Sequence, residues 1–369
     1  MKILLVQLYS NGDCLFATTI ARQIKNDFPG CNLTWAISSF NSSIIENNPF
    51  VDQILKVDSV VKNDVKSFRN FVHHAFKEKQ SGVYDEVFVV HNADKNNAYF
   101  DGSIRGSILN AYPYSITVPI QPVLRNTEQE IIHVEHFVKS HSLEKFKNVI
   151  LFEFAPQSGQ IDMSTELAVS IAESLVSDGE TAVILSSANR ISHANEAIID
   201  GSSLSFRETA KLSHYCNFLL GCSSGITWIT TSDAGKLLPM VQLLNPRVRW
   251  FNPISFDFKR FGIDFDKVIE LVNYDQSIIV DCVKTALHDF YKAKLKYNQS
   301  FKVGFRTSRT IIYNFLLSAD FTSILKHIKI NIQHNGLKFD FMREVSLAFL
   351  LFPFYFIKVK LLKKENLRL

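Results

Sequence analysis

The stretch of sequence that decides the fold is residues 2–30, which read KILLVQLYSNGDCLFATTIARQIKNDFPG. Residues 3–8 form an apolar run of strand length, and residues 15–28 carry apolar side chains at helical spacing before Pro29-Gly30. Only the short polar turn 9–14 separates the two. A buried strand that leads through a tight turn into a helix begins a βαβ unit, so this stretch predicts a parallel sheet covered by helices.

The same alternation continues beyond residue 30. Further strands are predicted at 32–37, 53–57 and 86–90, and helices at 42–47 and 65–79. A proline-containing crossing at 113–126 and a helix at 127–141 follow, and the pattern then restarts. In this second half, strands are predicted at 149–154, 181–185, 218–221, 240–243 and 268–271. Helices are predicted at 164–178 and 277–291, and a further helix begins at the capping box Ser205-x-x-Glu208. Right-handed crossovers place helices on both faces of such sheets. We therefore expect two successive α/β domains, residues 1–145 and 146–299, each with a doubly wound parallel sheet.

Composition agrees with two well-packed domains. The chain has 369 residues, of which 46% are hydrophobic and 21% charged, and this excludes global disorder. The five cysteines form no C-x-x-C pair and are odd in number, which argues against a disulfide framework and against a zinc site. We therefore expect a reduced compartment and no metal.

Charge is separated along the chain. Residues 300–369 hold twelve Lys/Arg against four Asp/Glu, whereas residues 1–299 hold 28 basic and 32 acidic side chains. A basic tail on a mildly acidic body indicates contact with an anionic surface and not a nucleic-acid partner.

Within this tail, residues 345–357 are apolar apart from Ser346 and Pro353, and lysines follow. A bilayer span needs about twenty such residues, so this segment is too short to cross a membrane. It can lie on an anionic membrane surface, or it can be a helix that packs on the body and leaves its basic end in water.

The first candidate site is the loop Ser10-Asn11-Gly12-Asp13, which follows the first strand. Ligands of parallel sheets gather outside the carboxyl ends of strands, and Gly12 permits the tight turn that such a loop needs. Asp13 then stands at the start of a helix, where a carboxylate is favoured electrostatically. It is either a helix cap or a group that accepts a proton from a bound hydroxyl.

The second candidate site is the segment 221–228, GCSSGITW, which joins a strand to a helix. Hydroxyls and backbone N–H groups there suit a phosphate or diphosphate, although an ordinary capped turn has the same pattern. The segment is neither G-x-G-x-x-G nor G-x-x-x-x-G-K-[ST], so dinucleotide and P-loop sites lose their main support. A third polar loop, 155–160, follows the first strand of the second domain.

Two segments of the chain resemble glycosyltransferase family 9, the lipopolysaccharide heptosyltransferases. In residues 1–55 the shared pattern is a strand, a loop ending in Gly12-Asp13, a helix, the turn Phe28-Pro29-Gly30, a strand with Trp35, and Asn48-Pro49-Phe50-Val51-Asp52 for the family's Asn-Pro-x-Val-Asp. In residues 205–228 it is the Ser-x-x-Glu helix, the following strand and the family's Gly-x-Asp-Ser-Gly loop.

The resemblance implies the GT-B architecture, in which two Rossmann-like domains face a cleft, here with a basic helical C-terminal tail. It also implies an inverting, metal-independent transfer of a sugar from a nucleotide-sugar donor to a lipopolysaccharide or surface-glycan acceptor, on the cytoplasmic face of the membrane and without a cofactor. Asp13 would be the general base. The acceptor-side loop would be Ser10, Asn11 and Gly12, and the donor-binding residues Ser158, Gln160, Ser186, Ser223, Ser224, Gly225 and Thr227.

The chain departs from the family at three places. Ser223 stands where the family has an acidic residue, Trp228 where it has a histidine, and the loop 155–160 lacks the family's basic residue. Two alternatives therefore remain open: a nucleotide-sugar epimerase of the same architecture, and a catalytically degenerate partner in a membrane-associated assembly.

Overall fold

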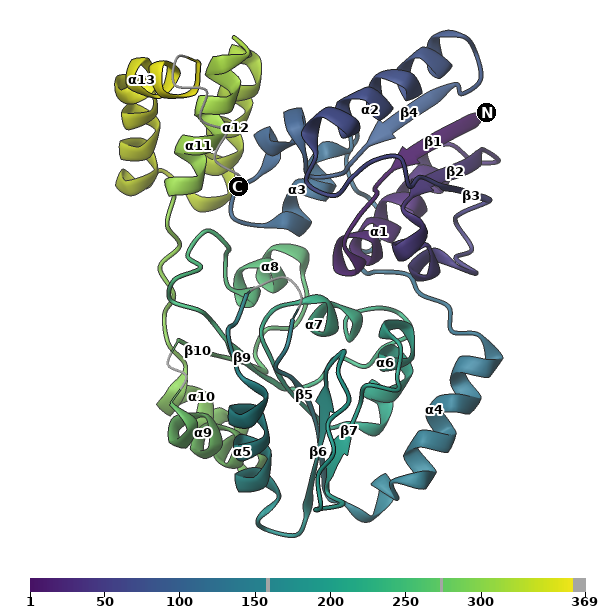
Figure 1. The fold of residues 1–369 in the computed structure, drawn as a ribbon, viewed down its shortest axis with the longest axis vertical. Helices are drawn as coiled ribbons and strands as arrows, with labels where there is room; N and C mark the ends of the chain where they lie inside the picture. The colour runs from purple at the N-terminus through teal and green to yellow at the C-terminus, as the bar shows by residue number, and fades with distance from the viewer. Residues whose placement is uncertain (157–159, 273–274, 361–369) are drawn as a thin grey trace.

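Two parallel sheets form the centre of the protein (Figure 1). The structure is a computed structural model that describes residues 1–156, 160–272 and 275–360. The first sheet has the order β3-β2-β1-β4 and the second the order β10-β9-β8-β5-β6-β7, with every neighbouring pair parallel. The strands are β1 Lys2–Val6, β2 Asn32–Ile37, β3 Gln53–Lys56, β4 Glu86–Val89, β5 Asn148–Glu153, β6 Thr181–Ser186, β7 Ile198–Asp200, β8 Phe218–Gly221, β9 Met240–Leu243 and β10 Val268–Leu271.

Helices cover both faces of the first sheet because the side chains of β1 alternate between two apolar clusters. Ile3 and Leu5 belong to the cluster that contains α1 (Asn11–Asp27) and α3 (Ile104–Ala111). Leu4 and Val6 belong to the cluster that contains Phe68 of α2 (Val65–Gln80). The predicted doubly wound arrangement is confirmed for this sheet.

The second sheet is covered in the same way. Its one face carries α5 (Thr165–Val176), α9 (Gln276–His288) and α10 (Phe290–Tyr297). Its other face carries α4 (Glu128–Ser140), α6 (Phe206–Leu212), α7 (Gly225–Ile229) and α8 (Ile254–Phe261). This second layer places α7 and α8 between the two sheets (Figure 1).

The two domains share one apolar core where α1 meets α7. Phe16 of α1 lies 5.3 Å, centroid to centroid, from Trp228 of α7 and also 5.3 Å from Phe261 of α8. Phe16 and Trp228 are fully buried. Burial of these rings from both sides fixes the start of α1 against the start of α7.

The basic tail is a unit of three helices that folds back on the first domain (Figure 1). These are α11 (Arg306–Leu317), α12 (Phe321–Asn335) and α13 (Phe339–Lys360). Phe341 and Ile312 pack in one cluster with Ala98, at the 3₁₀ segment η2 (Asp94–Tyr99), and Phe100. No helix in the part of the chain that the structure describes is both long enough and apolar enough to cross a membrane.

Several elements differ from the sequence-based expectations. The single helix expected at 277–291 is wrong: Asp289 has an extended backbone and caps α10, so the segment forms two helices. The helix expected at 42–47 is a 3₁₀ segment, η1 (Ser39–Ile45). Strand β7 and helices α3 and α8 were not predicted, because each has at most eight residues and too few turns to show a period.

Candidate functional site

The strand order of each sheet reverses beside its first strand. In the first sheet the chain runs from β1 outward to β2 and β3 and returns to β4 on the other side of β1. In the second sheet it runs from β5 to β6 and β7 and returns to β8 on the other side of β5. Such reversals of strand order are where ligands bind in open α/β sheets. The loop 7–10 leaves the first reversal point and the loop 222–224 the second.

The loop after β1 brings Asp13 to the first turn of α1, and the side chain of Asp13 does not cap the helix. Ser10 precedes the helix with φ +70°, a backbone conformation that a non-glycine residue rarely adopts, and α1 has no side-chain capping bond. The Asp13 carboxylate makes no hydrogen bond in the described structure and is half-buried. Burial raises its pKa, while the positive charges of Arg105 and Lys62 lower it. Asp13 therefore has a free carboxylate with increased basicity.

Buried hydrogen bonds to Gln242 and Glu153 fix the loop at the second reversal point. Ser223 has φ +59°, and its backbone N–H donates to Oε1 of Gln242. Thr227 is fully buried, and its hydroxyl lies 3.3 Å from Nε2 of the same glutamine. The hydroxyl of Ser224 donates to Oε1 of Glu153, the last residue of β5. Backbone strain of this kind persists only where neighbouring groups enforce it, and Gln242 does so here.

The two loops touch at a pair of glycines. A Cβ on Gly12 would lie 3.2 Å from Cα of Gly225 and 3.4 Å from Nη2 of Arg105. A Cβ on Gly225 would lie 2.9 Å from Cε2 of Phe206. A side chain at position 12 would press on the backbone of Gly225, and one at position 225 would press on the ring of Phe206, so glycine at both positions permits this close approach. The loops that contain Gly12 and Gly225 consequently face each other across the domain boundary.

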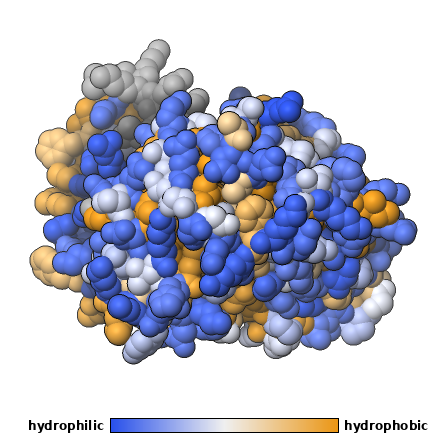
Figure 2. Space-filling model, turned by 90° about the horizontal axis from the view of Figure 1, so that it is seen from below, coloured by the Kyte–Doolittle hydropathy of each residue, from blue (hydrophilic) through white to orange (hydrophobic). Residues whose placement is uncertain are grey.

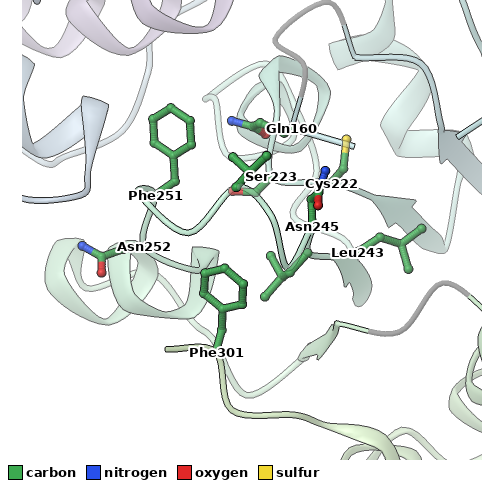
Figure 3. Close-up of a pocket in the computed structure, with 10 residues that line it drawn as sticks. Gln160, Cys222, Ser223, Leu243, Asn245, Phe251, Asn252 and Phe301 are labelled. Atoms are coloured by element: carbon green, nitrogen blue, oxygen red, sulfur yellow. The ribbon is translucent and has the colours of Figure 1, made fainter. Parts of the chain in front are cut away.

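A small pocket opens beside the second loop (Figure 3). Its walls include Gln160, Ser223, Phe251 and Phe301, and it holds about 320 Å³ of space, open mouth included. Gln160 also has a buried side-chain oxygen that accepts no hydrogen bond. The pocket thus joins two of the expected donor residues, from the loops after β5 and β8.

The other expected donor residues are placed differently. Ser186 ends β6, and no hydrogen bond joins its side chain to the 222–224 loop among the described residues. Ser158 lies outside the described residues. Gly225 meets Gly12 at the domain boundary and Ser223 lines the pocket, whereas Ser224 is buried against Glu153 and Thr227 is fully buried.

Three charged residues at this boundary were missed by the sequence reasoning. Arg105 of α3, Glu153 of β5 and Asp257 of α8 are 8%, 4% and 5% exposed. Burial raises the pKa of both carboxyl groups to about 7, and the charge of Arg105 lowers both. Glu153 did leave a signal, since it is the one charged residue in the apolar run 149–154. Arg105 and Asp257 left none, because the short helices that carry them were not predicted.

No metal centre is found in the described part of the chain: none of its His, Cys, Asp and Glu side chains form a group of three or more that could hold an ion. All five cysteines are buried free thiols, and burial raises the pKa of Cys222 well above its usual value. Cys222 is therefore a packing residue and not a nucleophile.

Comparison with solved structures identifies the same architecture. The glycosyl transferase family 9 protein from Veillonella parvula superposes with a TM-score of 0.54 and 14% sequence identity, covering 80% of this chain and 95% of its own. The E. coli ADP-heptose lipopolysaccharide heptosyltransferase II superposes with a TM-score of 0.52 and 15% identity, covering 80% of this chain and 99% of its own. By sequence, the chain matches no family model and no curated protein. The predicted resemblance to family 9 is confirmed at the level of the fold.

Proposed function

We propose that this chain is a glycosyltransferase, which moves a heptose or another sugar from a nucleotide-sugar donor to a hydroxyl of a lipopolysaccharide or other surface-glycan acceptor. The observation that carries the proposal is the contact of two loops from different sheets at Gly12 and Gly225, each at the reversal point of its sheet. The fold shared with the two solved transferases supports it.

In the proposed reaction Asp13 is the general base. Its carboxylate is free of hydrogen bonds, and its raised pKa makes it a better proton acceptor than an exposed aspartate. The acceptor oxygen forms a bond to the anomeric carbon while the bond from that carbon to the donor phosphate breaks. The proton passes to Asp13, and the nucleoside diphosphate leaves with the electron pair. A single displacement of this kind inverts the anomeric configuration and needs no covalent intermediate.

We assign the donor to the second loop and its pocket. Ser223, Ser224 and Gly225 would contact the diphosphate, and Gln160 the nucleoside part, because these residues surround the carboxyl ends of β5 and β8. Ser10 and Asn11 would contact the acceptor. Ser186 and Ser158 stay as further donor candidates on the neighbouring loops.

We further propose that the tail holds the protein on an anionic membrane surface, near a lipid-linked acceptor. Phe341, Val345 and Ala348 of α13 are buried against the tail's own core, and a second face stays exposed. That face carries Phe349, Leu350, Phe354, Phe356 and Ile357, followed by Lys358. Figure 2 shows apolar surface gathered along the edge of the molecule where this unit lies. An apolar helix face beside lysines suits the interface of an anionic bilayer.

The test begins with the donor. Purified protein is heated in the presence of ADP-, GDP-, UDP- or CMP-sugars, and a donor that binds only the folded state raises the melting temperature. Asp13→Asn should keep this response and lose transfer to the acceptor by about 10²- to 10⁴-fold. Asp27→Asn, at the other end of the same helix, is the control and should leave transfer unchanged.

The alternatives give different results. An epimerase would interconvert sugars of the bound donor without any acceptor. A degenerate assembly partner would bind and turn over no nucleotide sugar. Transfer at the normal rate by Asp13→Asn would show that another group is the base.

A further inference from the structure

Arg105 reaches from the first domain into the second. It lies in the first turn of α3, whose N-cap is Ser103. Its guanidinium carbon stands 5.0 Å from the ring centroid of Trp228, in α7 of the second domain. The side chain is buried, with 8% of the residue exposed. An arginine of the acceptor-side domain thus ends at the base of the donor-side loop.

The guanidinium of Arg105 makes no hydrogen bond and no ion pair with any described residue, and its Nε is buried without a partner. Arginine carries five N–H donors in a planar fork, and burying them unpaired is costly. The contact with the Trp228 ring offsets only part of this cost. An arginine kept in such a position is explained by a ligand that supplies the missing acceptors.

The side chain of Arg105 ends beside the contact of the two loops. Nη2 of Arg105 lies within 3.4 Å of the position that a Cβ on Gly12 would take, and Cα of Gly225 within 3.2 Å of it. Guanidinium, acceptor-side loop and donor-side loop therefore converge. The loop 155–160, by contrast, carries no basic residue.

The carboxyl groups around Arg105 do not form an ion pair with it in the described structure. Asp13 of α1, Glu153 of β5 and Asp257 of α8 all interact with it electrostatically, but none lies within ion-pair distance. Burial holds the pKa of Glu153 and of Asp257 near 7, so each is protonated for much of the time at neutral pH. The boundary thus retains a positive charge that an anionic ligand can neutralise.

We propose that Arg105 is an anion-binding residue for the donor, whose guanidinium binds the diphosphate of a nucleotide sugar from the side of the first domain. This inference rests on the proposed function and specifies it: the cation that stabilises the leaving group comes from the domain that binds the acceptor. As the bond from the anomeric carbon to the phosphate oxygen breaks, the electron pair moves onto that oxygen, and the N–H groups of Arg105 donate to it. Leaving-group departure would then require both domains.

The experiment compares Arg105→Gln and Arg105→Lys with the full-length wild type, by calorimetric titration with ADP, GDP, UDP and the corresponding nucleosides. Loss of a charged, two-pronged contact should weaken binding of the nucleoside diphosphate about 10- to 100-fold and leave binding of the nucleoside unchanged. Lysine keeps the charge without the fork, so its affinity should lie in between. Arg306→Gln, an exposed arginine at the start of α11, is the matched control and should bind as the wild type does.

The outcomes separate this inference from the proposed function. If the wild type binds a nucleoside diphosphate and Arg105→Gln binds it equally well, Arg105 is not the phosphate ligand, although donor binding stands. An equal loss for nucleoside and nucleoside diphosphate would show a structural role and overturn the inference. A weakened acceptor KM with unchanged nucleotide affinity would assign Arg105 to an anion of the acceptor instead. If the wild type binds no nucleotide at all, both proposals fail.

Discussion

Replacing Glu153 with glutamine should stabilise the protein above pH 7 and stabilise it much less at pH 5. Glu153 ends β5 with 4% of its surface exposed, and its Oε2 has no hydrogen-bond partner. Its other oxygen accepts a hydrogen bond from Ser224. Burial raises its pKa from 4.5 to about 7, a value that already includes the opposing effects of Ser224 and Arg105. The folded protein therefore prefers the neutral carboxylic acid.

The sign and size follow from linkage. Between pH 4.5 and 7 the folded state holds more protons than the unfolded state, so the free energy of unfolding falls as pH rises through this window. One pKa unit is worth about 1.4 kcal/mol, so the ionised Glu153 costs the folded state about 3 kcal/mol above pH 7. Glutamine keeps the shape and the acceptor for Ser224 but cannot ionise. The variant should gain about 3 kcal/mol at pH 8 and only about 1 kcal/mol at pH 5.

Urea denaturation, followed by circular dichroism at pH 5, 6, 7 and 8, measures the difference between the two proteins. Glu180→Gln, an exposed glutamate beside Lys147 at the start of β6, is the control and should change stability by less than about 0.5 kcal/mol at every pH. A gain for Glu153→Gln of equal size at pH 5 and pH 8, or a loss at pH 8, would refute the reasoning, since neither fits a carboxyl group kept neutral by burial.

The same carboxyl group should couple donor binding to pH. It lies against the loop that we assign to the diphosphate, and an anion bound there repels an ionised Glu153. Affinity of the wild type for a nucleoside diphosphate should therefore fall as pH rises above 7, and that of Glu153→Gln should change much less. Titrations at pH 6 and pH 8 test this directly.

Three further predictions concern contacts outside this carboxyl group. Gly12→Ala should push the donor-side loop away, because the added Cβ would lie 3.2 Å from Cα of Gly225. The variant should lose more of its transfer rate than of its stability, and measurements of transfer rate and melting temperature test this. Arg207→Ala should cost about 3–5 kcal/mol in urea denaturation, because it leaves the partly buried Glu130 carboxylate, 2.6 Å from Nε of Arg207, without its ion-pair partner. Phe354→Glu should lower sedimentation with anionic vesicles without loss of folding, whereas Ile132→Glu, an exposed apolar residue of α4, should not.

How much of the fold could be predicted from the sequence depends on the length of each element. Apolar runs such as 3–8 and 149–154 predicted strands correctly because a strand buried on both faces needs no polar residues. The loops at Asp13 and Ser223 were found for a related reason: a run of small polar residues between a buried strand and a helix is rare and marks the carboxyl edge of the sheet. The sequence therefore predicted the polar residues of these two loops and the edge of the sheet on which the loops lie.

The partners of these loops could not be predicted, because they come from elements that carry little pattern. Arg105 and Asp257 lie on helices of eight residues, and an apolar period cannot be recognised over about two turns. Their burial depends on Trp228 and on the approach of a second domain, and neither is a local property. Glu153 and Glu270 show why a charged residue in a buried strand is an ambiguous signal. Glu270 is also a single charged residue in an apolar strand, and its carboxylate accepts a hydrogen bond from Ser255. A charge in a buried strand marks a polar contact but does not say whether a ligand completes it.

The apolar contact of Phe16 with Trp228 and Phe261 limits how far the two loops can separate. Phe16, Trp228 and Phe261 form a buried cluster immediately behind the contact of Gly12 with Gly225. Separating the two loops would expose these rings to water, and rings of this size bury roughly 150–250 Å² each. At about 25 cal/mol per Å² that exposure costs several kcal/mol, so we expect the loops to stay together in the proposed reaction. If the proposed function is correct, we expect the donor to bind along the pocket lined by Gln160 and Phe251 (Figure 3), with the two loops already in place and without closure of the domains.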